Sequence, residues 1–254
     1  MIHIASLGSG SKGNGTLIKS DSTCVLVDCG FGLREATRRL KSKGVEPESL
    51  DAIIVTHEHS DHSGGVEKLA RKYQLPVWLT PGTHLHRSCA DIVNFNYCLP
   101  EQAFQLGNLT IQPFTVPHDA REPAQFIFSS GDVTVGLLTD VGHITYHIIE
   151  TLSSCDGLLL EFNHCPERLW NGNYPYPLKQ RVGGDLGHLS NHQSLELLSR
   201  LDHSKLKVLV AMHLSGENNC PDLVQNLISE QFPEIPKVIA EQTTGTDWIT
   251  VNLS

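Results

Sequence analysis

Three histidines and Asp61 fall within the six positions from His57 to His62. Residues 51–56 before them form an apolar, β-branched run that is typical of a buried strand, and residues 63–70 after them resemble the start of a helix. A loop at the C-terminal end of a strand is where α/β sheets usually hold their functional sites. This segment therefore predicts an α/β fold with a site at one sheet edge.

The spacing within the segment predicts metal binding. Side chains two positions apart in an extended chain point the same way, so His57 and His59 can share one ion. The chain then turns into the helix, which lets Asp61 and His62 face a second ion nearby. Imidazole and carboxylate ligands together suit Zn, Mn or Fe. A solvated loop that happens to be rich in histidine is the alternative, and four ligands at this spacing between a strand and a helix argue against it.

Polar residues also stand at the ends of other predicted strands. His118 follows a strand over residues 111–116, and we assign it as the third ligand of the ion held by His57 and His59. Asp140 follows a strand over residues 132–139 and is placed to bridge two metals with its two oxygens. Asp119 is a competing carboxylate, which we expect to point away if His118 points inward. Positions 163 and 213 repeat the pattern, so several strand ends are expected to share one site.

The composition limits the classes of function. A formal charge of −9 argues against a large nonspecific nucleic-acid surface. It does not exclude a nuclease, because bound divalent ions would add positive charge where a phosphate must sit. Seven cysteines without a CxxC pair, and no segment typical of a signal peptide, favour a reduced, cytoplasmic protein. No apolar run is long enough to span a bilayer, so we expect no membrane partner.

The order of the predicted elements indicates the architecture. No low-complexity segment or linker divides the chain, so we expect one domain over residues 1–254. Each half reads as strands followed by helices, which fits a four-layer αβ/βα sandwich with the metals at the sheet edge between the halves. The oligomeric state is left open.

Several motifs resemble a known family. The pattern His-x-His-x-Asp-His at residues 57–62 resembles the signature of the metallo-β-lactamase-fold hydrolases. The whole chain resembles the YycJ-like (WalJ) branch of that fold, and segments with Asn163-His164, with Gly187-His188-Leu189-Ser190-Asn191 and with His213-Leu214-Ser215 narrow it to this branch. One departure is Cys165, which stands where the branch leads us to expect an aspartate. The other segments that carry the resemblance are residues 7–14, 117–119, 139–142, 174–175 and 178–181.

The resemblance implies a phosphodiesterase with exonuclease action on DNA from the 5′ end. The order Glu161, His188, His213 also resembles the tRNase Z arrangement. There a glutamate orients a histidine that serves the leaving group, and a final histidine binds metal. DNA is favoured over RNA as the partner.

Our hypothesis is a metal-dependent phosphodiester hydrolase, a nuclease acting as a 5′ exonuclease on DNA, in which two divalent ions activate a hydroxide. Asp61 orients the hydroxide and takes its proton. His188 protonates or stabilises the departing oxygen, and Glu161 holds the imidazole of His188. Zn or Mn are the expected ions, with Fe as a further candidate. One ion is assigned to His57, His59, His118 and Asp140, and the other to Asp61, His62, Asp140 and His213.

Weaker candidates for substrate contact line the same loops. Capping of helices and turns explains each of these polar residues equally well. They are Ser9, Ser11, Asn14, Asn163, His164 and Asn191.

Two other functions stay open at this point. The same metal motif serves thioester, lactone and β-lactam hydrolysis, so a thioesterase of the glyoxalase type is an enzymatic alternative. A non-catalytic regulatory binding protein with a metal site is an alternative of another class, although the complete set of ligands argues against it. The sequence does not decide the metal, DNA against RNA, or endo against exo cleavage.

Overall fold

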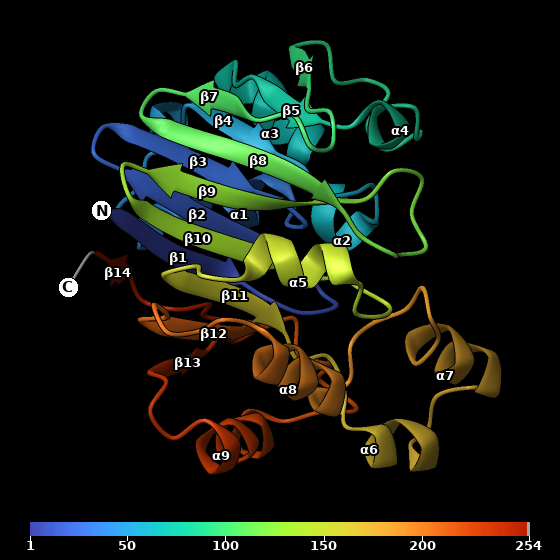
Figure 1. The fold of residues 1–254 in the computed structure, drawn as a ribbon. Coiled ribbons are helices and arrows are strands. Elements are labelled where there is room, and N and C mark those ends of the chain that lie inside the picture. Colours follow the sequence, from blue (N-terminus) through green and yellow to red (C-terminus); the bar gives the residue numbers. More distant parts are fainter. Residues whose placement is uncertain (253–254) are drawn as a thin grey trace.

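Two seven-stranded sheets pack face to face in the computed structural model, which describes residues 1–252 (Figure 1). The first sheet has the spatial order β14 (Ile249–Val251), β1 (Ile2–Gly8), β2 (Gly15–Ser20), β3 (Thr23–Val27), β4 (Ala52–Ile54), β5 (Val77–Leu79) and β6 (Phe95–Tyr97). The second has the order β13 (Lys237–Ile239), β12 (Val208–Met212), β11 (Gly157–Glu161), β10 (Val133–Leu138), β9 (Ala124–Ser130), β8 (Leu109–Thr115) and β7 (Phe104–Leu106).

Helices connect the strands and cover the outer faces of both sheets. In the described part of the chain, none of them is long and apolar enough to cross a lipid bilayer. The helices are α1 (Leu33–Ser42), a 3₁₀ turn at Pro47–Ser49, α2 (Ser60–Ser63), α3 (Val66–Tyr73), α4 (Pro81–His84), α5 (Tyr146–Leu152), α6 (Pro166–Asn171), α7 (Tyr176–Val182), α8 (Asn191–Arg200) and α9 (Pro221–Gln231).

The apolar runs become strands that are buried on both faces. Alternate side chains of a strand point to opposite sides of its sheet. In β4, Ala52 and Ile54 enter the core between the sheets, whereas Ile53, and Val55 just after the strand, enter the core beneath α1 and α3. In β11, Leu159 faces the core between the sheets, and its neighbours on either side face the core beneath α5, α8 and α9. The resulting helix–sheet–sheet–helix order confirms the expected αβ/βα sandwich.

Parallel pairing brings the functional strand ends together. β3 pairs with β4 in parallel, and β10, β11 and β12 also run parallel to one another. β8 reaches the same direction through two antiparallel steps across β9. The residues after each of these strands therefore leave the sandwich at the same edge.

Three parts of the sequence-based prediction differ from the structure. The helix expected to start near residue 63 begins at Val66 as α3, and a separate short helix, α2, precedes it, because the Gly65 N–H donates to the Cys29 carbonyl at 2.7 Å and not to a helical carbonyl. The sequence analysis did not predict β6, whose residues do not alternate between buried and exposed. α6 and α7 were not predicted. α7 buries no residue, so it has no amphipathic pattern to find.

The contact between Gly30 and the Asp61 loop offers a test of this packing. A Cβ atom on Gly30 would overlap the Asp61 carbonyl, which accepts a hydrogen bond from Asn14 N at 2.8 Å. Gly30→Ala is expected to lower the free energy of unfolding by about 1–3 kcal/mol, the usual cost of overpacking. Urea unfolding would measure it. Gly216→Ala is the control, because no heavy atom lies within 4 Å of its Cβ position. Equal stability of the two variants would contradict the packing argument.

Candidate metal centre

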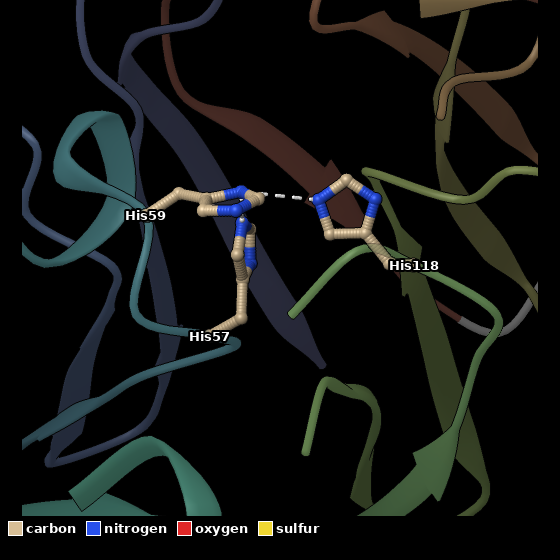
Figure 2. A group of neighbouring side chains, drawn as sticks. All are labelled: His57, His59 and His118. Carbon is tan, nitrogen blue, oxygen red and sulfur yellow. Dashed lines mark hydrogen bonds between the residues drawn. The ribbon is translucent and has the colours of Figure 1, made fainter. Parts of the chain in front are cut away.

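Three imidazoles from both sheets meet at the shared edge. His57 and His59 lie on the loop after β4, and His118 lies on the loop after β8. His59 Nδ1 is 3.0 Å from His57 Nε2 and 3.2 Å from His118 Nε2. Figure 2 shows the three rings turned toward one another. One nitrogen from each ring can therefore reach a common point, as the sequence spacing predicted.

A second group of donors lies beside the first. Asp61, His62 and His213 each offer one ligand atom to a common point, and so do His57, His62 and Asp140. His62 Nε2 is 3.0 Å from Asp140 Oδ2, and His213 Nε2 is 3.6 Å from both Asp140 Oδ1 and Asp61 Oδ2. The structure thus brings together all seven residues that the sequence analysis named as metal ligands.

The donor chemistry fits a divalent cation. Within residues 1–252, the buried atoms Asp140 Oδ2 and His213 Nε2 have no hydrogen-bond partner. Burial lowers the pKa of His57 and of His118, so both rings are neutral and have a nitrogen lone pair to offer. Burial also opposes charge on His213, but Asp140, Asp61 and Glu161 outweigh it and raise the pKa of His213 to about 10. Neutral imidazole nitrogens beside carboxylates whose negative charge favours a cation are what a divalent metal ion satisfies.

Asp28 supports this cluster, and sequence reasoning missed its role. Asp28 Oδ2 lies 2.8 Å from His62 Nδ1, which leaves His62 Nε2 to face the other donors. The carboxylate also accepts hydrogen bonds from the Thr56 backbone N–H and hydroxyl, each at 2.8 Å. A carboxylate behind a ligand histidine fixes the tautomer and the ring orientation. The signal was available, because Asp28 follows an apolar strand as Asp140 does.

Three residues at the turns that follow strands have a left-handed backbone conformation. Asp28, Asp140 and His213 each follow a strand and have φ angles of 60°, 54° and 56°. Such values cost free energy for residues other than glycine and persist where the surrounding structure enforces them. Ser9 contributes to this enforcement, because its hydroxyl accepts the backbone N–H of His213 at 2.7 Å.

His188 and Glu161 form a pair beside the donors. His188 Nδ1 is 2.8 Å from Glu161 Oε1, and the second oxygen of Glu161 accepts the backbone N–H groups of Val141 and Leu189. Burial alone would raise the pKa of Glu161, but the charge and hydrogen bond of His188 lower it to about 2. Glu161 is fully buried, and His188 retains contact with solvent. The pair therefore has the geometry that the sequence-based assignment requires, with His188 Nε2 left unengaged by Glu161.

A cavity of about 300 Å³ opens onto this cluster. The loops that carry the candidate metal ligands form one side of the cavity, and α7 with the residues just before it forms the other. Its lining residues are Ser11, His59, Ser60, Asp61, Asp140, Tyr174, Leu178, Arg181, Val182, His188 and His213.

Most of the side chains suggested for substrate contact are buried. The amide of Asn14 lies 3.0 Å from His62 Nε2, and that of Asn163 lies 3.2 Å from His213 Nδ1. Asn191 exchanges hydrogen bonds with Asn219 at 2.8 and 3.1 Å. Burial lowers the pKa of His164 to about 4. Together with Ser9 these groups lie inside the protein, and Ser11 is the member of the set that lines the cavity.

Asp119 does not point fully away from the cluster, contrary to expectation. Its Oδ1 lies 3.5 Å from His118 Nε2 and 3.7 Å from His59 Nε2. Its Oδ2 accepts a hydrogen bond from Arg181 Nε at 2.6 Å. The carboxylate therefore lies between Arg181 of α7 and the two histidines.

Comparisons with known proteins agree with this geometry. Residues 23–214 match the family model described as the beta-lactamase superfamily domain. Exodeoxyribonuclease WalJ of Streptococcus pneumoniae is 35% identical over 234 residues, which cover 90% of this chain and 87% of that protein. Exodeoxyribonuclease YycJ of Bacillus anthracis is 30% identical over 238 residues, covering 92% and 90%. The metallo-beta-lactamase fold protein YhfI from Bacillus subtilis superposes with a TM-score of 0.75 at 18% identity, covering 98% of this chain and 100% of that one, a likeness of fold.

Asp28→Asn tests the support behind His62. The amide keeps the shape of the carboxylate but not its charge toward His62 Nδ1, so metal affinity is expected to fall about 10–100-fold. Competition with a chelator would measure the affinity. Asp156→Asn is a matched control, because Asp156 is equally buried and accepts the Thr134 N–H and hydroxyl far from the metal ligands. The same loss of affinity in both variants would contradict a specific role for Asp28.

Proposed function

The chain belongs to the β-lactamase superfamily, in the family of WalJ and YycJ, and we propose that it is a metal-dependent nuclease that hydrolyses DNA from the 5′ end. The observation that carries the proposal is the convergence of seven donor side chains at one sheet edge, where four of them and His188 line a cavity. The two relatives are named exodeoxyribonucleases, which supports DNA as the substrate. Because the donors come from both sheets, we also propose that residues 1–254 act as one domain.

We propose that the site binds two divalent ions, Zn or Mn, with Fe as a further candidate. One would be held by His57, His59, His118 and Asp140, and the other by Asp61, His62, Asp140 and His213. Such ions, when bound, act as Lewis acids on a phosphoryl group and lower the pKa of water to about 7. Divalent-metal binding itself agrees with the fold and with the His/Asp groups.

The chain's own groups position and protonate the reactants. Asp61 lines the cavity and can accept a hydrogen bond from the attacking water and take its proton. His188 can donate a proton from Nε2 to the departing sugar oxygen, because Glu161 occupies its Nδ1. Two backbone N–H groups hold Glu161 in turn, so the imidazole cannot rotate away. Ser11 replaces the buried polar residues as the proposed substrate contact, and Asn14, Asn163 and Ser9 position His62 and His213 instead.

The cytoplasmic location is also a proposal. It is supported by the cysteines, because all seven thiols are free in the structure. Burial raises the pKa of Cys29 and of Cys98 to about 12, so these thiols are unreactive core groups.

Substitution of His188 and of His59 should separate chemistry from metal binding. His188→Ala is expected to lower kcat about 10²–10⁴-fold with metal content retained, because it removes a proton donor. His59→Ala is expected to lose both metal and activity, since it removes a ligand. Activity assays and elemental analysis would measure the two effects. His192→Ala, an exposed histidine on α8, is the control. Loss of metal in His188→Ala would contradict the division of roles.

A substrate panel tests the proposed reaction. We expect the protein loaded with Mn²⁺ or Zn²⁺ to release nucleotides from the 5′ end of labelled DNA, and to cleave RNA and thioesters more slowly. Electrophoresis of the labelled products would follow the reaction. Preferred cleavage of a thioester would favour the glyoxalase-type alternative. Full metal occupancy without turnover of any substrate would favour a regulatory binding protein.

A further inference from the structure

The helix α7 is unusual because it buries none of its side chains. With α6 it projects from the body of the sandwich, at the lower right of Figure 1. Tyr176 is 64% exposed and Trp170 is 47% exposed. Their ring centroids lie 6.4 Å apart with an angle of 49° between the planes. Neighbouring large apolar side chains at a surface indicate binding, and we call Trp170, Tyr174 and Tyr176 the aromatic face.

The aromatic face continues into the cavity of the metal centre. Tyr174, Leu178 and Arg181 line that cavity together with Asp61 and His188. The same short segment therefore carries exposed rings at its outer end and cavity-lining groups at its inner end. A chain-like ligand that lies on the rings leads directly to the donor cluster.

The segment is also more positively charged than the rest of the protein. Residues 166–187 contain three cations and two carboxylates, whereas the whole chain has a formal charge of −9. The side chain of Arg181 is 56% exposed and pairs with Asp119 at 2.6 Å. An exposed pair of this kind is weak, and a guanidinium binds phosphate oxygens with the same geometry as a carboxylate. Arg181 can therefore exchange Asp119 for a phosphate at the cavity mouth.

The aromatic face is held in place before any ligand binds. Lys179 Nζ donates to the Trp170 carbonyl at 2.7 Å, which ties α7 to the end of α6. Prolines 166, 175 and 177 restrict the backbone on either side of the rings. The backbone N–H of His188 donates to the Val182 carbonyl at 2.9 Å, which connects α7 to the loop that carries His188. A surface that is already ordered loses little entropy on binding.

We propose that the aromatic face binds unpaired nucleotides of the substrate strand, with bases stacked on Trp170 and Tyr176 and a phosphate bound by Arg181. This inference rests on the proposed nuclease function and names the part of the substrate held outside the metal centre. Stacking suits a nuclease without sequence preference, because every base has a π face. Single-stranded ends present such faces, whereas a closed duplex does not. A second copy of the chain is the competing occupant.

The binding test compares the wild type with the double variant Trp170→Ala/Tyr176→Ala. Fluorescence anisotropy would follow a labelled oligothymidylate of about eight nucleotides, with phosphorothioate linkages that resist cleavage. The double variant is expected to bind at least about 25-fold more weakly, because each of two stacked bases contributes about 5-fold or more. Trp170→Phe keeps a ring and is expected to stay within about two-fold of the wild type. Tyr97→Ala is the control, since Tyr97 is 46% exposed on β6 at the far end of the molecule (Figure 1).

Hydrolysis of a small chromogenic phosphodiester separates this inference from the proposed function. The ratio of DNA cleavage to small-diester cleavage is expected to fall at least about 5-fold in the double variant. A wild type that cleaves neither substrate would disprove the nuclease function, while the affinities would still decide the inference. DNA affinity that is unchanged in the double variant, or that falls equally in Tyr97→Ala, would overturn the inference. So would a wild-type dimer, seen by light scattering, that the double variant breaks without losing DNA affinity.

Discussion

Lone pairs of buried nitrogen and oxygen atoms face one another at the edge between the two sheets, and the rest of the structure holds them there. His57, His59 and His118 present ring nitrogens about a hydrogen-bond length apart. Asp140 and His213 add buried atoms that find no hydrogen-bond partner within residues 1–252. Such an arrangement is unfavourable for the unpartnered atoms, because they have lost their hydration without a replacement. A rigid scaffold must therefore oppose its relaxation, and a divalent cation is the group that would satisfy it.

The scaffold achieves this with strand ends and with a layer of groups behind the donors. The parallel strands β3 and β4 bring Asp28 and His57 to one edge, and β10, β11 and β12 bring Asp140, Glu161 and His213 there. Behind the donors, Asp28 fixes His62, the Gly187 carbonyl lies 3.1 Å from His118 Nδ1, and Asn163 lies beside His213. These contacts set which nitrogen of each ring faces inward. The cores on both sides of each sheet then resist displacement of the loops.

Sequence-based prediction succeeded for the elements whose buried side chains leave a regular apolar pattern in the sequence. The strands with continuous apolar runs, such as β4, β11 and β12, were predicted because both of their faces are buried. The same reasoning missed β6 and α7, whose side chains are largely exposed, because a pattern of burial cannot mark an element that buries little. It also assigned substrate contacts to polar residues near the site by position alone. Whether Asn14 or Asn191 faces the cavity or the interior depends on partners that lie far away in the chain.

By itself, the sequence determined the class of the fold and the seven candidate metal ligands, because strand periodicity and ligand chemistry are local properties of the chain. Local spacing also placed His57 beside His59. Only the tertiary structure decided how close His118 from the other sheet comes to that group, that Asp28 stands behind His62, and that Asp119 turns toward Arg181. It also decided that the rings of α6 and α7 stay exposed beside the cavity. These features depend on how two sheets pack and where their loops meet, and no short stretch of sequence contains that information.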